Sequence, residues 1–138
     1  MTGSAERASA DNGRDDVPEA ALVAARAADA KLGQDTVVLA MRDLLGVTDA
    51  FVVTSGANTR QVRTIVEEVE RRVKESTGRT PRAVEGLRDL TWVLMDYGDF
   101  LVHAFLAEAR AYYDLERLWG DAPRMAFTGS ASHRSAED

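Results

Sequence analysis

Apolar positions recur with a helical period over one long stretch of the chain. Valine and isoleucine stand at i, i+3, i+4, i+7 and i+11 on one stripe, and charged residues fill the opposite face. The stripe consists of Val62, Ile65, Val66, Val69 and Val73. Asn58 is a candidate N-cap, Gln61 completes a capping box, and Gly78 stands where the helix should end. This pattern predicts a long amphipathic helix.

Two further segments have helical spacing. Residues 18–32 are rich in alanine, with Pro18 in the first turn and Gly33 as the stop signal, which predicts a helix that packs closely on a sheet. Near the other end of the chain, Asp114 can cap a short helix. One face of that helix would carry Leu115, Leu118 and Trp119, with Tyr112 one turn earlier.

Shorter segments have the composition of β-strands: residues 36–40, 50–54, 82–85, 91–95 and 100–106. The run at 50–54 is continuously apolar, which predicts a central strand buried on both faces. Residues 96–99 form a turn signal in which Gly98 can take positive φ, so the last two strands should be an antiparallel hairpin.

The predicted order of elements is α-β-β-α-β-β-β-α. Strand, Ser55-Gly56 turn, long helix and next strand make a βαβ-type unit. Only parallel neighbours need such a crossover helix, whereas the hairpin is antiparallel. We therefore expect an α/β domain with a mixed five-stranded sheet flanked by helices, in a nucleotidyltransferase-like outline.

Composition divides the chain into a domain and two tails. Residues 2–16 and 128–138 contain no Val, Ile, Leu, Phe, Tyr or Trp, so they cannot offset the entropy of ordering. We expect disordered tails at residues 1–16 and 128–138 and a single folded domain at 17–127.

Composition also excludes several functions. The chain has no cysteine, which removes disulfides, Cys-based zinc sites and thiol nucleophiles. It shows neither a targeting segment nor a membrane-length apolar run, so a cytoplasmic protein with no membrane contact is expected. The formal net charge is −6, and no basic patch is evident. Because phosphate binding depends on such patches, we expect a basic protein as partner and no sequence-specific binding to nucleic acid.

Five spaced segments of this chain resemble the Iojap family of ribosomal silencing factors. They are residues 48–56 (TDAFVVTSG), 60–62 (RQV), 85–86 (EG), 92–99 (WVLMDYGD) running to His103, and Arg110 with 113–121 (YDLERLWGD). Each segment alone is a weak signal, but together they occur in order over about three quarters of the chain. The resemblance implies a non-enzymatic protein without cofactors. Such a protein binds large-subunit ribosomal protein uL14, number fourteen in the universal naming, and sterically blocks the small subunit, which represses translation.

The strand at 91–95 carries the sharpest site hypothesis. Its alternation places Trp92, Leu94 and Asp96 on one face and Val93 and Met95 on the other. If the second face points into the core, the first forms an aromatic, apolar and acidic patch typical of a binding hot spot. The alternative is that Trp92 belongs to the core and Asp96 only forms the turn.

The resemblance supports the binding hypothesis for this patch. With its neighbours, the expected partner-binding set is Trp92, Leu94, Asp96, Tyr97, Asp99, Tyr113 and Trp119. Tyr113 and Trp119 equally fit a role in docking the C-terminal helix on the core, or in a homodimer contact of the free protein.

Other candidate groups have simpler explanations. Asp96, Asp99 and Glu85 could be ligands of a hard cation, but turn chemistry explains the two aspartates, so we expect no metal site. His103 lies in an apolar strand and is best interpreted as a structural histidine. Arg60 and Arg63 begin the long helix, where the helix dipole disfavours positive charge, a mild indication of an anionic neighbour.

Two alternative functions stay open at this stage. One is a nucleotide-handling enzyme of nucleotidyltransferase outline, suggested by the Ser55-Gly56 turn before the helix. Such enzymes hold two metal ions with carboxylates that alternate along a strand, whereas here Glu67 and Glu68 are adjacent within a helix. The other is a homodimeric adaptor whose open sheet face pairs with itself. Without an assembled catalytic set, we expect no enzymatic activity.

Overall fold

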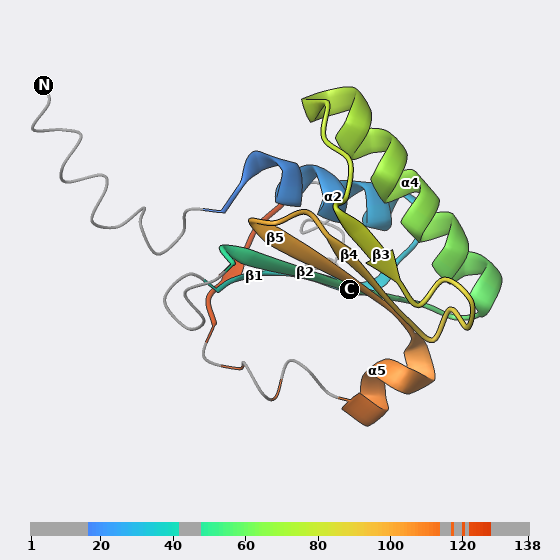
Figure 1. Cartoon of the computed structure of the whole chain (residues 1–138). Coiled ribbons are helices and arrows are strands. Elements are labelled where there is room, and N and C mark those ends of the chain that lie inside the picture. The colour runs from blue at the N-terminus through green and yellow to red at the C-terminus, as the bar shows by residue number, and fades with distance from the viewer. Residues whose placement is uncertain (1–16, 42–47, 114–116, 118–119, 121, 128–138) are drawn as a thin grey trace, which may run out of the picture.

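The computed structural model describes residues 17–41, 48–113, 117, 120 and 122–127. Within these residues a mixed sheet carries two helices on one face, and a third helix lies at the other face (Figure 1). This arrangement confirms the predicted α/β class with a mixed sheet. The predicted tails, residues 1–16 and 128–138, lie outside the described residues.

Six strands form the sheet, in the order β3-β4-β5-β2-β1-β6. Their bounds are Gln34–Ala40 (β1), Ala50–Gly56 (β2), Ala83–Glu85 (β3), Trp92–Asp96 (β4), Phe100–Leu106 (β5) and Arg124–Met125 (β6). β2 pairs in parallel with β5, whereas every other neighbouring pair is antiparallel. The antiparallel β4–β5 hairpin is therefore confirmed, and so is the central, fully buried position of β2.

The sheet has one strand more than the five predicted. β6 is only two residues long and pairs with β1, with Met125 opposite Val38. A two-residue strand has no period of its own, and it forms only because the chain end returns to a free sheet edge.

The long helix α4 (Thr59–Thr77) begins and ends where the sequence predicts. The side chain of Asn58 accepts a hydrogen bond from the backbone N–H of Gln61, 2.9 Å away, and Gln61 Oε1 accepts one from the N–H of Ala57 at 2.7 Å. Gly78 ends the helix in the left-handed conformation, at φ 77°. Local capping chemistry therefore sets both ends of α4.

Helix α2 (Glu19–Ala30) is shorter than the predicted 18–32. The chain leaves the helix through Lys31, and Leu32 takes positive φ, 65°, before Gly33. Gln61 of α4 donates through Nε2 to the carbonyl oxygens of Lys31 and Leu32 at 3.1 and 2.9 Å. A side chain from another helix therefore satisfies the carbonyl groups at this turn.

Helix α5 (Ala107–Tyr113) follows β5 without a loop and was not predicted. The helix predicted to start at Asp114 falls on residues 114–116, 118–119 and 121, which lie outside the described residues. None of the helices in the described parts of the chain is long and apolar enough to cross a membrane.

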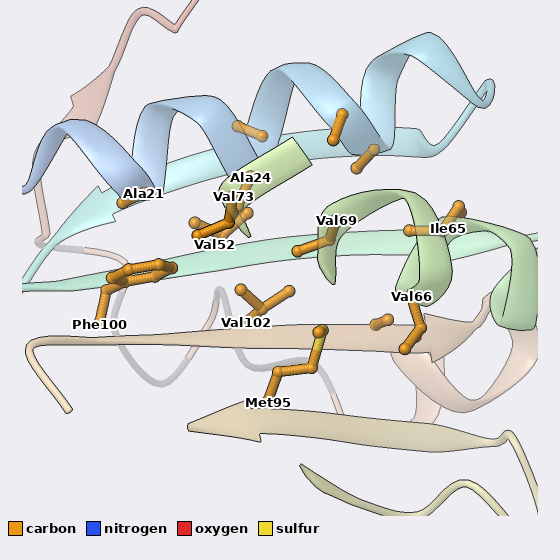
Figure 2. Packing of buried hydrophobic residues seen from close by; sticks show 14 of the residues in the cluster. Ala21, Ala24, Val52, Ile65, Val66, Val69, Val73, Met95, Phe100 and Val102 are labelled. Atoms are coloured by element: carbon orange, nitrogen blue, oxygen red, sulfur yellow. The ribbon is translucent and has the colours of Figure 1, made fainter. Parts of the chain in front are cut away.

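The core lies between the sheet and the pair α2 and α4. Figure 2 shows Val66, Val69 and Val73 of α4 above the sheet, and every member of the predicted valine and isoleucine stripe is 0–3% exposed. Alanines of α2, among them Ala21 and Ala24, let this helix approach closely. The sheet contributes Val52, Val93, Met95, Phe100 and Val102 to the same cluster.

Replacing Asn58 by alanine should lower the free energy of unfolding by about 1 kcal/mol, because the Gln61 N–H loses its acceptor. Urea unfolding followed by circular dichroism measures the effect. Asn58→Asp keeps an acceptor and adds a charge that the helix dipole favours, so it should be as stable as the original chain. Equal losses in both variants would contradict the capping role.

Candidate functional site

Strand β4 presents two different faces. Val93 and Met95 are fully buried against the layer of α2 and α4. Trp92, Leu94 and Asp96 point to the opposite face, and each is partly exposed. The condition of the hot-spot hypothesis, that Val93 and Met95 point into the core, is therefore met. Trp92 is partly exposed and also packs against a second buried cluster on its own face of the sheet.

Pairing with β5 extends this face by one residue that the sequence analysis missed. In the hairpin register, Leu94 stands opposite His103 and Asp96 stands opposite Leu101. Directly opposed residues share a face of the sheet, and Leu101 is also partly exposed. We call Trp92, Leu94, Asp96 and Leu101 the hairpin patch. The predicted hairpin register could have revealed Leu101.

The Trp92 indole packs against two residues of β5, Phe105 and His103. Its ring centroid lies 4.9 Å from that of Phe105 and 6.0 Å from that of His103. Its Nε1–H donates a hydrogen bond to Nδ1 of His103 over 3.1 Å. The half-buried aromatic residue of the patch therefore has a defined orientation.

Asp96 combines a turn role with a partly exposed carboxylate. Its Oδ1 accepts a hydrogen bond from the N–H of Gly98 at 2.8 Å, and Gly98 has φ 94°. The predicted positive φ in the turn is confirmed. Oδ2 lies 3.2 Å from Nη2 of Arg82, a side chain that is 69% exposed. Since that pair is largely solvated, it holds Asp96 weakly, and the carboxylate stays accessible to another cation.

Asp99 and Tyr97, in the turn after β4, make contacts outside the hairpin patch. Asp99 forms an ion pair with Arg79 at 2.7 Å, and the guanidinium of Arg79 also donates to the carbonyl oxygen of Tyr97. Tyr97 is 3% exposed and stacks on Phe100, with ring centroids 4.6 Å apart. From this buried position Tyr97 cannot reach a partner, so it does not belong to the patch. Tyr97 follows β4 directly and belongs to the same core cluster as Val93 and Met95.

His103 lies behind the patch, on the same face of the sheet. It is 5% exposed and its ring packs 4.6 Å from that of Phe51. Burial lowers its pKa to about 4, so the imidazole is neutral at neutral pH. The prediction of a structural histidine omitted its hydrogen bond to Trp92, a contact between diagonal positions of the hairpin.

Two predicted site residues, Tyr113 and Trp119, are not placed relative to the patch. Tyr113 ends α5, but its side chain lies outside the described structure, and Trp119 lies outside the described residues altogether.

Within the described residues, the groups considered for a nucleotidyltransferase site make other bonds. The predicted Ser55-Gly56 turn is the end of strand β2, and Ser55 Oγ donates to the carbonyl oxygen of Gln34 and accepts from Arg110. Glu68 is bound by Arg71 and Arg72 at 2.7 and 2.8 Å, which lowers its pKa to about 2. Within residues 17–41, 48–113, 117, 120 and 122–127, no three His, Asp or Glu side chains are grouped to hold a metal ion.

Comparison with known proteins agrees with the resemblance seen in the sequence. The family model "Ribosomal silencing factor during starvation" (RsfS) matches residues 14–138. The chain belongs to this family. A relative of the silencing-factor family from Halalkalibacterium halodurans, named ribosomal silencing factor RsfS, is 37% identical over 110 residues, which covers 80% of this chain and 93% of the relative.

Structural and more distant relatives agree with membership in the silencing-factor family. A crystal structure of a Chromobacterium violaceum protein has a TM-score of 0.71 and 33% identity, covering 76% of this chain and 87% of that protein. A mouse protein named "Mitochondrial assembly of ribosomal large subunit protein 1" is 32% identical over 88 residues, which is 62% of this chain and 39% of the mouse protein. The chain therefore acts as a ribosome-associated silencing factor and a regulator of translation.

Tyr97→Phe should leave the free energy of unfolding unchanged or raise it by up to about 1 kcal/mol. The Tyr97 hydroxyl is buried and has no hydrogen-bond partner in the described structure, and this burial raises its pKa to about 12. Deleting a buried, unpaired hydroxyl removes a desolvation cost and keeps the ring stacking. Urea unfolding measures the change, and a loss above 1 kcal/mol would mean that the hydroxyl is bonded.

The free energy of unfolding should fall as pH drops from about 6.5 to about 4, by about 3 kcal/mol from His103 alone. Its folded pKa lies below its unfolded value, so in this window the unfolded state binds the proton and the folded state does not. Urea midpoints between pH 7.5 and 4 for the original chain and for His103→Asn isolate this contribution. Parallel pH profiles for the two proteins would disprove it.

Proposed function

We propose that this silencing factor binds large-subunit ribosomal protein uL14 through the hairpin patch and thereby blocks association with the small subunit. The observation that carries the proposal is the composition of the patch. Trp92, Leu94 and Leu101 supply partly exposed apolar surface, and Asp96 supplies a carboxylate beside it. Aromatic anchors with adjacent charge on a rigid element are typical of interface hot spots.

The charge of the chain supports a basic protein as partner. The formal net charge is −6, and the partly exposed Asp96 carboxylate is paired with a largely solvated arginine. Opposite charge steers association and fixes orientation, whereas an RNA surface would repel this protein. The name of the mouse relative also refers to the large ribosomal subunit. We extend that association to this chain.

The proposed mechanism is steric and needs no chemistry. We infer that the protein acts in the cytoplasm without a cofactor, by occupying a surface that the small subunit needs. The bonded state of Ser55 and the ion-paired state of Glu68 support this reading, because neither is available to substrate or metal. Binding energy alone then determines how strongly translation is repressed.

The double variant Trp92→Ala with Asp96→Asn should weaken binding to purified large subunits by about 30-fold or more, since it removes the aromatic anchor and the charge. Asparagine keeps an acceptor for the Gly98 N–H, so the turn survives. Co-sedimentation of graded protein concentrations with separated subunits in sucrose gradients measures the affinity. A subunit-joining assay should show the same loss of inhibition.

A matched control is Leu32→Ala with Glu67→Gln. It truncates a leucine that is 77% exposed in the turn after α2 and removes one exposed carboxylate of α4. The control should bind and inhibit joining like the original chain. Circular dichroism and solution mass confirm that each variant keeps its fold and its association state. Equal affinity of the patch variant and the control would refute the docking site. Failure of the original chain to bind large subunits would refute the function.

A further inference from the structure

His103 is a buried polar residue with only one of its two ring nitrogens hydrogen-bonded in the described structure. It is 5% exposed, its Nδ1 accepts a hydrogen bond from Trp92 Nε1–H at 3.1 Å, and its Nε2 is buried without a partner in the described structure. Because Nδ1 is the acceptor, the single proton of the neutral ring lies on Nε2. The ring therefore buries an unbonded N–H donor among aromatic residues, which is unfavourable.

An apolar residue of similar size would avoid that cost. The pocket around His103 consists of the rings of Phe51, Phe105 and Trp92, which would accept a leucine or a phenylalanine. What an apolar residue cannot supply is the acceptor for the Trp92 indole. Among the contacts of His103 in the described structure, the bond that orients Trp92 is therefore the one that needs a polar side chain.

The orientation of Trp92 matters because its side chain is only half-buried. Without an acceptor inside, the indole N–H gains hydration by rotating toward solvent, and the ring would then populate several rotamers. A partner would have to select one of these rotamers and lose their entropy on binding. A hydrogen bond made before binding removes this cost.

We propose that His103 is a positioning residue that holds the Trp92 indole in its docking orientation through the Nδ1 acceptor. This role deepens the proposed function, and its expected effect on affinity rests on that function. It adds to the hairpin patch a residue that lies behind the exposed surface. His103 does not touch the partner itself, because Trp92 and its neighbours cover it. It acts only by limiting the conformations of the anchor.

Two substitutions separate positioning from general stability. His103→Leu introduces an apolar side chain of similar bulk and removes the acceptor. His103→Asn keeps an acceptor, since Oδ1 of asparagine occupies about the position of Nδ1, but leaves buried amide hydrogens unbonded. The leucine variant should therefore be the more stable of the two, whereas the asparagine variant should be the better binder. A purely structural role would rank stability and affinity in the same order.

The first readout is independent of the ribosome. The chain has two tryptophans, so the indole N–H resonance of Trp92 in a ¹⁵N spectrum is assigned with the Trp119→Phe variant. The Trp92 resonance should be shifted downfield and protected from solvent exchange in the original chain and in His103→Asn. In His103→Leu it should move upfield and exchange faster. An unchanged resonance in His103→Leu would overturn the proposal.

The second readout is affinity for purified large subunits. His103→Leu should bind about two- to tenfold more weakly than the original chain, whereas His103→Asn should keep most of the original affinity. Equal affinity of the leucine variant and the original chain would overturn the proposal even if the spectra differ. If the original chain itself fails to bind, the docking function is wrong, and the indole resonance alone then decides whether His103 orients Trp92.

Discussion

The pleat of the β4–β5 hairpin is the constraint on which the rest of the structure depends. Alternate residues of the two strands must point to opposite faces, and α2 and α4 seal only one of them. Val93 and Met95 have to lie on the sealed face, because they complete a cluster with the valines of α4. Trp92, Leu94 and Asp96 are thereby turned to the opposite face. Burial on one side therefore creates the surface on the other.

The second face is organised by a few polar bonds within aromatic packing. Asp96 closes the turn through Gly98 and keeps its carboxylate partly exposed, while His103 bonds the Trp92 indole from beneath. The same residues therefore stabilise the hairpin and shape its surface. The end of β2, by contrast, is occupied by a bond between Ser55 and Arg110. This division fits the proposed role, in which the protein acts by occupying a surface.

Much of the fold could be predicted from local patterns. The period of the valine stripe, the Asn58 cap and the Gly78 stop determine α4 through contacts within a few residues. The hairpin turn and the apolar run of β2 are equally local signals. Prediction failed where an element depends on distant chain segments. β6 pairs with β1, and α2 ends just before two residues, Lys31 and Leu32, whose carbonyl groups bind Gln61 of α4.

For the candidate site, the sequence by itself determined which residues share a face of β4 and that the chain resembles a silencing factor. The alternation along the strand could not decide which face is exposed, because both faces carry apolar residues, Trp92 on one and Met95 on the other. Only the tertiary structure decided this, since the helices cover one face and leave the other partly open. The tertiary structure also buried Tyr97 and brought His103 to Trp92. These contacts depend on strand register, which joins residues that lie apart in the sequence.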